Sequence, residues 1–104
     1  MEIAGILQEL KQRLQELYGE RLKGLYLYGS HARGEATADS DIDVAVILED
    51  YASVGAEISR TSHLVAELSL RYNCVLALIP IREAEWRKRK SPLLLNLRRE
   101  GVTV

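Results

Sequence analysis

Apolar residues recur along this chain at a helical spacing in two stretches. Over residues 2–18 they fall three or four positions apart, which predicts an amphipathic helix. The same spacing returns over residues 53–72 and predicts a second helix. The expected apolar stripe of that second helix consists of Val54, Ile58, Thr61, Val65 and Leu68.

Three other stretches show strand patterns. The run LYLY at 25–28 is rich in β-forming residues and ends at Gly29. Residues 41–48 alternate, with Ile42, Val44, Val46 and Leu48 facing one way and Asp41, Asp43, Ala45 and Ile47 the other. The nearly unbroken apolar run at 74–81 is typical of a buried strand. Strand, helix and strand over 41–80 therefore predict one right-handed, parallel βαβ unit.

The end of the chain predicts two further helices. A short charged helix is expected over 83–90, and a second one starts at Ser91 as cap with Pro92 in the first position. That helix is expected to stop at Gly101, and residues 102–104 either add a short edge strand or fray. The whole pattern predicts an α/β (α+β) fold: a single domain over 1–104, with a small mixed sheet flanked by helices.

The composition of the chain favours a globular protein over membrane-spanning or disulfide-bonded classes. With 104 residues, 47% hydrophobic and 28% charged, the chain suits one globular domain. A net charge of -1 gives no reason to expect strong binding to nucleic acid or membranes. No apolar run reaches the ~18 residues of a membrane span, and the single Cys74 excludes an internal disulfide. A reducing cytoplasm is the expected location.

Two aspartates at alternate positions are the first candidate for chemistry. On a strand, Asp41 and Asp43 share a face about 6.6 Å apart along the backbone, and paired carboxylates suit Mg²⁺, which prefers oxygen ligands. The alternative is that Asp41 only begins the strand while Asp43 is solvated on an open sheet face. Because Asp43 lies in an otherwise apolar strand, where an unpaired carboxylate is costly, the metal interpretation gains weight.

The segment before the aspartates reads GSHARGEATADS at 29–40. Glycine lets a phosphate approach backbone N–H groups closely, and a helical turn after Ser30 would direct its free N–H groups at the same anion. An ordinary turn is the simpler alternative. Arg33 either contacts a phosphate or supports the loop through Glu35, Asp39 or Asp41. We interpret His31 as an exposed loop residue.

Taken together, G-S-x-A-R-G-x-A-x-x-x-S-D-I-D-x-x-V over residues 29–46 resembles the signature of the DNA polymerase β-like nucleotidyltransferase superfamily. It is most similar to the minimal nucleotidyltransferases, MNT proteins often paired with HEPN-domain partners. The resemblance implies nucleotide binding by Gly29, Ser30, Arg33 and Ser40. It also implies that Asp41 and Asp43 are catalytic and bind Mg²⁺, in a two-metal site that bridges the phosphates of ATP or another nucleoside triphosphate.

The chain departs from that family in one respect. The superfamily usually carries a third carboxylate on the strand after the crossover helix, and here that strand reads CVLALIPI, without an acid. Two functions therefore remain open. The first is an Mg²⁺-dependent transferase that modifies its partner, as the MNT antitoxin of a HEPN toxin, with AMP from ATP. The second is a catalytically weak or inactive nucleotide-binding module that neutralises its partner by binding.

A transferase for small molecules is disfavoured because no second domain is present. Nucleic acid is not an expected partner, and a homo-oligomer is compatible with the sequence.

Overall fold

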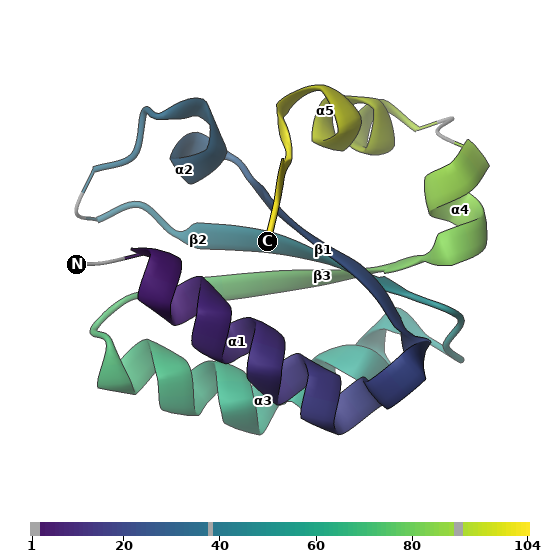
Figure 1. Ribbon diagram of the computed structural model, residues 1–104, viewed down its shortest axis with the longest axis horizontal. Coiled ribbons are helices and arrows are strands. Elements are labelled where there is room, and N and C mark those ends of the chain that lie inside the picture. Colours follow the sequence, from purple (N-terminus) through teal and green to yellow (C-terminus); the bar gives the residue numbers. More distant parts are fainter. Residues whose placement is uncertain (1–2, 38, 89–90) are drawn as a thin grey trace.

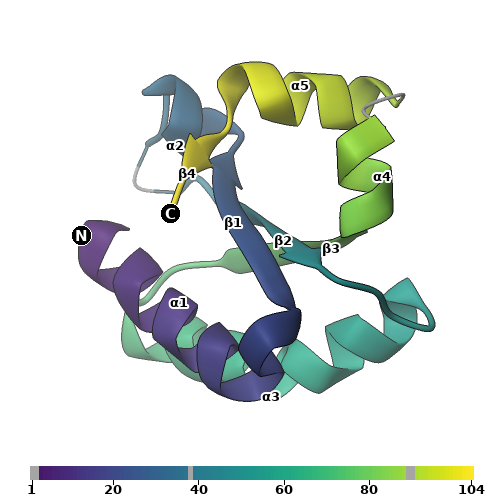
Figure 2. The same ribbon diagram turned by 45° about the vertical axis from the view of Figure 1, so that its right-hand side comes forward.

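A computed structural model describes residues 3–37, 39–88 and 91–104 of the chain. Its elements are α1 (Ile3–Tyr18), a 3-10 turn (Gly19–Arg21), β1 (Leu22–Tyr28), α2 (Ser30–Arg33), β2 (Ile42–Leu48), α3 (Val54–Arg71), β3 (Leu76–Arg82), α4 (Glu83–Lys88), α5 (Pro92–Glu100) and β4 (Val102–Thr103). The strands form one sheet in the order β3-β2-β1-β4. Helices α1 and α3 cover one face of this sheet, and α4 and α5 lie over the other (Figures 1 and 2).

The sheet is mixed, as the sequence predicts. β1 pairs antiparallel with both β2 and β4, whereas β2 and β3 run parallel on either side of the α3 crossover. The strand boundaries differ from the prediction at two places. β1 begins at Leu22, three residues early, and β3 begins at Leu76, two residues late. The terminal residues predicted to pair or fray do form a short edge strand.

Strand β2 is buried on both faces. Its residues Ile42, Val44, Val46 and Leu48 join α1 and α3 in the main core. Its other face is also covered beyond Asp43, because Ala45 and Ile47 pack with Trp86 of α4 and with α5 in a second, smaller core. The face that carries Asp43 is therefore open only at its beginning, and α4 and α5 close the rest.

The predicted apolar stripe of α3 is partly wrong. Thr61 and Leu68 are buried, but Val54 and Ile58 are 45% and 52% exposed. The buried face instead includes Leu64 and Glu57. Glu57 is only 3% exposed, and its carboxylate accepts a 2.9 Å hydrogen bond from the Tyr18 hydroxyl of α1. A buried carboxylate needs a hydrogen-bond partner, and the Tyr18 hydroxyl provides one for Glu57. The face of α3 that packs on α1 therefore includes an acidic residue, which the spacing of apolar residues does not predict.

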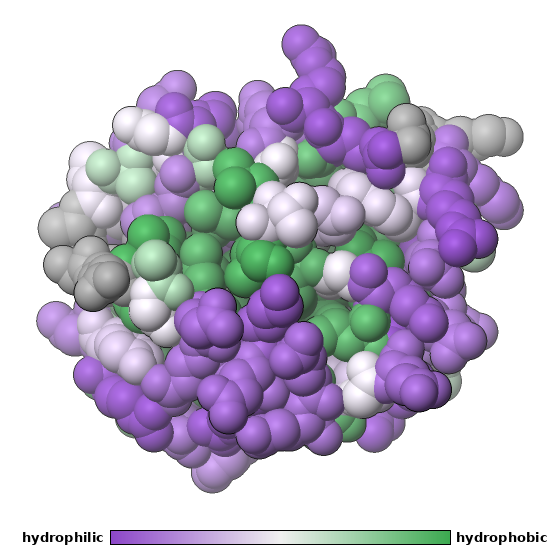
Figure 3. Space-filling view, in the orientation of Figure 1, coloured by the Kyte–Doolittle hydropathy of each residue, from purple (hydrophilic) through white to green (hydrophobic). Residues whose placement is uncertain are grey.

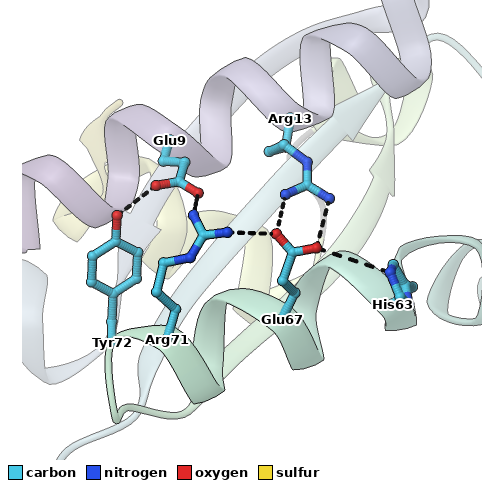
Figure 4. Close-up of polar contacts among 6 residues, drawn as sticks. All are labelled: Glu9, Arg13, His63, Glu67, Arg71 and Tyr72. Atoms are coloured by element: carbon cyan, nitrogen blue, oxygen red, sulfur yellow. Dashed lines mark hydrogen bonds and ion pairs between the residues drawn. The ribbon is translucent and has the colours of Figure 1, made fainter.

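A network of ion pairs also joins α1 to α3 (Figure 4). Glu67 of α3 accepts bonds from Arg13 of α1, at 2.6 Å, and from Arg71, at 2.9 Å. Glu9 of α1 contacts Arg71 and accepts a hydrogen bond from the Tyr72 hydroxyl. These contacts fix the two helices side by side on the face of the sheet opposite Asp43.

The edge of the sheet formed by β1 and β4 is only partly covered. β4 pairs with β1 at two positions, Tyr26↔Thr103 and Leu27↔Val102. Figure 3 shows apolar surface across the middle of this side, between hydrophilic regions over α1 and α5. A groove of about 270 Å³ lies along β1 there, lined from Leu22 to Tyr26 and by Lys11 and Val104. Within the described residues, no helix is long and apolar enough to cross a membrane.

Candidate functional site

The end of β1 and the beginning of β2 meet at the candidate site. Their antiparallel register places Tyr28 opposite Asp43, and Gly29 follows Tyr28 directly. Gly29 has φ 73° and ψ -154°, a conformation essentially restricted to glycine. A Cβ atom at position 29 would also lie 2.5 Å from Oδ2 of Asp43. The loop and the carboxylate are thus in direct contact, and only glycine fits between them.

A single helical turn, α2, follows Gly29, so of the two conformations that the sequence leaves open the structure has the helical one. The Gly29 carbonyl accepts hydrogen bonds from the N–H groups of Ala32, at 3.1 Å, and Arg33, at 3.2 Å. Gly34, at φ 74° and ψ 17°, ends the turn in the left-handed conformation. This geometry places Ser30 at the start of α2, directly beside the glycine that contacts Asp43.

Ser40 and His31 close the loop on itself. The Ser40 hydroxyl accepts a 2.9 Å hydrogen bond from the Thr37 N–H. The Nε2 atom of His31 lies 3.5 Å from the Ser40 carbonyl oxygen. His31 is half-buried rather than freely exposed, so the interpretation of His31 as an exposed loop residue is wrong. A nucleotide-binding role for Ser40 remains a prediction, and the structure shows this hydroxyl supporting the turn before Asp41.

The two aspartates share an electrostatic environment that favours a cation. Asp41 is exposed just before β2, and Asp43 is half-buried as the second residue of the strand. Loss of solvent raises the pKa of Asp43, and the negative charge of Asp41 raises it further. His31 and Arg33 act in the opposite direction on the same pKa. A bound divalent cation would relieve both unfavourable effects, and the paired oxygen ligands fit Mg²⁺.

On strand β3, the residue beside Asp43 is not an acid. In the parallel register of β2 and β3, Asp43 lies beside Ala77, which is half-buried. Neighbouring strands lie about 4.8 Å apart, so this is the nearest strand position to Asp43 on that side. Over 3–37, 39–88 and 91–104, no group of three His, Cys, Asp or Glu side chains lies together as a metal site would require. β3 adds no acid to Asp41 and Asp43, and the role of these two aspartates as metal ligands stays a prediction.

Arg33 is engaged by carboxylates of the protein itself. Its Nε atom lies 3.2 Å from Glu35, and its Nη1 atom lies 3.4 Å from Glu100 at the end of α5. The hydrogen bond to Glu35 raises the pKa of Arg33 most, loss of solvent opposes this, and the bond to Glu100 adds to the rise. Of the two roles that the sequence leaves open for Arg33, support of the loop is the one that these two contacts favour.

Sequence reasoning missed Glu100 as a neighbour of the loop. Glu100 is 67 positions from Arg33, and a terminal acid on an exposed helix carries no signal of such a contact. For Tyr28 the sequence did give an indication of its place near the site, since it directly precedes Gly29 and Ser30. Tyr28 lies opposite Asp43 in the register of β1 and β2, and burial, followed by the charge of Asp43, raises the pKa of Tyr28.

Comparison with known proteins points to one family. The family model for the nucleotidyltransferase domain matches residues 7–94. The chain is 40% identical over 75 residues to the protein adenylyltransferase MntA of Thermococcus cleftensis, covering 72% of this chain and 74% of that protein. Its fold is similar to a chain of a toxin-antitoxin complex with AMP-PNP, with a TM-score of 0.62 and 20% identity, covering 92% of this chain and 70% of that one. A chain from a complex of tri-AMPylated Shewanella oneidensis HEPN toxin with MNT antitoxin gives a TM-score of 0.52 and 19% identity, covering 92% and 69%.

Proposed function

Because this chain belongs to the nucleotidyltransferase domain family, we propose that it transfers AMP from ATP to a HEPN-domain partner and acts as the antitoxin of that partner. The similarity to MntA, a protein adenylyltransferase, supports a protein acceptor and AMP as the transferred group. The similar folds in complexes of MNT and HEPN proteins support the choice of partner. A cytoplasmic setting agrees with the free thiol of Cys74.

One observation carries the proposal: the contact of Gly29 with the Asp43 carboxylate. It brings the loop suited to phosphates and the carboxylates suited to a metal into one place. A nucleoside triphosphate bound with a divalent cation would need both at once, because the loop would hold the phosphates and the carboxylates would hold the cation. A surface turn that merely preceded a strand would not need its glycine pressed against a half-buried aspartate.

Each residue has a distinct role in this proposal. Asp41 and Asp43 would hold Mg²⁺, whose charge would neutralise the phosphates. The backbone at Gly29 and the hydroxyl of Ser30 bind phosphate oxygens and hold the α-phosphate in line with the acceptor. The acceptor hydroxyl oxygen then forms a bond to the α-phosphorus, and the bond from that phosphorus to pyrophosphate breaks. Since Ala77 occupies the strand position beside Asp43, the hydroxyl proton passes to solvent rather than to a third carboxylate.

The second candidate function is a nucleotide-binding module that neutralises its partner by contact. The alanine beside Asp43 is the observation that favours it. Without a third carboxylate on β3 to hold a metal at the attacking hydroxyl, nucleotide binding can persist while transfer slows. The two functions differ in what they predict for the aspartates. A transferase needs Asp41 and Asp43 to label its partner, whereas a binding module neutralises its partner without them.

The test incubates the protein with α-labelled ATP, Mg²⁺ and a HEPN-domain protein as the candidate partner. We expect label on the partner, and we expect Asp41→Asn or Asp43→Asn to abolish it. Glu49→Gln is the matched control, because Glu49 is exposed at the far end of β2 and its loss should leave labelling intact. Tight association without label, unaffected by either aspartate change, would establish the binding module instead.

A further inference from the structure

The helical turn that carries Ser30 is too short to hold its own position. α2 has four residues and lies between two glycines at positive φ, Gly29 and Gly34. A helix of this length is unstable by itself in water, since nucleation costs more than one turn returns. The turn therefore depends on contacts with the rest of the protein, of which the packing of Ala32 against the main core is one.

Arg33 makes the contact between α2 and helix α5. It is the last residue of α2, and its Nη1 atom lies 3.4 Å from Oε2 of Glu100, the last residue of α5. Figures 1 and 2 show α2 and α5 on the same side of the molecule. Among the ion pairs of the described residues, this is the only one between α2 and α5.

Helix α5 is a fixed support for that contact. Its residues Leu94 and Leu97 are buried in the smaller core against the sheet. Its start is capped by Ser91, whose hydroxyl accepts the Leu94 N–H at 3.1 Å. A carboxylate at the end of such a helix holds a defined place, so it can restrain a guanidinium on a less stable segment.

The second ion pair of Arg33 cannot do the same. Glu35, 3.2 Å from Nε of Arg33, lies two residues along in the same loop and is more exposed than Glu100. A pair within the loop moves with the loop. Glu35 and Glu100 therefore carry the same charge and share one partner, but only Glu100 connects α2 to the packed layer of α4 and α5.

From this geometry we propose that Glu100 is a positioning residue for the nucleotide site. Through Arg33 it ties α2 to α5, which holds Ser30 and the Gly29 backbone in the arrangement that receives phosphates. This inference rests on the proposed function, because it assigns the tie a role in nucleotide binding. Loss of the tie leaves the loop to be ordered when the ligand binds, and that ordering lowers affinity.

The experiment compares Glu100→Gln with the matched control Glu35→Gln. Hydrogen exchange is measured over peptides covering residues 29–37, and the Kd for AMP-PNP is measured with Mg²⁺. We expect Glu100→Gln to speed exchange in these peptides and to raise the Kd about two- to fivefold, as loss of an exposed ion pair allows. Glu35→Gln removes the same negative charge near the site and should not weaken binding.

A double-mutant cycle separates the tie from any general effect on the fold. In an Arg33→Gln background, Glu100→Gln should change neither loop exchange nor Kd further. An equal effect of Glu100→Gln with and without Arg33 overturns the inference, as does unchanged loop exchange in the single variant. If the wild-type protein binds no AMP-PNP, the proposed function fails, and the exchange measurements still decide whether the tie exists.

Discussion

Gly29 and Asp43 lie so close that any side chain at position 29 would meet the carboxylate, with a Cβ atom 2.5 Å from Oδ2. Gly29→Ala must therefore move the loop, the aspartate or both, in addition to adopting a backbone conformation that alanine avoids. We expect a loss of about 1–3 kcal/mol in the free energy of unfolding and loss of AMP transfer. Urea unfolding and the labelling assay measure the two effects.

Gly55→Ala is the control for this change. Gly55 lies in the first turn of α3, and an added Cβ there meets nothing within 4 Å. We expect it to leave stability unchanged or to raise it by up to about 1 kcal/mol, because alanine loses less backbone entropy on folding. A Gly29→Ala protein as stable and active as the wild type would contradict the close contact.

The raised pKa of Asp43 makes a prediction about stability and pH. Its ionised form is disfavoured in the folded protein, first by loss of solvent and then by Asp41. A carboxyl whose pKa is raised on folding costs stability above that pKa and costs nothing below the ordinary value of about 4. Asp43→Asn should therefore raise Tm at pH 7, and the gain should vanish as the pH falls below about 4. A lower Tm for Asp43→Asn at pH 7 would refute the prediction.

Ala77 offers a way to add the missing acid. Ala77→Asp would place a third carboxylate on β3 beside Asp43. Three acids in one place repel without a metal, so this variant should melt below wild type in EDTA and regain stability in millimolar Mg²⁺. Ala77→Asn has nearly the same size without the charge and should respond to Mg²⁺ as the wild type does. Equal Mg²⁺ responses in the two variants would show that position 77 does not face the metal site.

The bond between Tyr18 and Glu57 makes a prediction about the packing of α1 on α3. Burial, and then the hydrogen bond to Glu57, raises the pKa of Tyr18 to about 12. Tyr18→Phe removes a buried donor and leaves Glu57 with the 3.3 Å contact from Arg60, so we expect a cost of about 1–3 kcal/mol. Because the phenol must stay protonated to donate, the contribution is present below pH 10 and is lost as the pH rises towards 12.

Tyr72→Phe provides the comparison for that variant. It is the same chemical change at a half-buried hydroxyl that also donates to a glutamate, Glu9. Chemical denaturation at pH 7 and pH 11 should show a larger loss for Tyr18→Phe at pH 7 and a smaller difference from wild type at pH 11. Equal losses for the two variants would mean that burial of Glu57 does not increase the contribution of the Tyr18 hydrogen bond to the free energy of unfolding.

The elements of this fold could be predicted from local pattern. Apolar spacing located α1 and α3, alternation located β2, and Ser91 with Pro92 marked the start of α5. Errors arose where a distant contact overrode the local signal. The α3 stripe was misassigned because Tyr18, 39 residues from Glu57, makes that acid a buried residue.

The sequence by itself determined which chemical groups the candidate site contains, because Gly29, Ser30, Asp41 and Asp43 are read from one continuous segment. Tertiary structure decided how those groups meet and what surrounds them. The register of three strands set Gly29 against Asp43 and Ala77 beside it, and the packing of α5 brought Glu100 to Arg33. Register and helix packing depend on the shape of the whole core, so contacts between residues far apart in the chain carry no local signal.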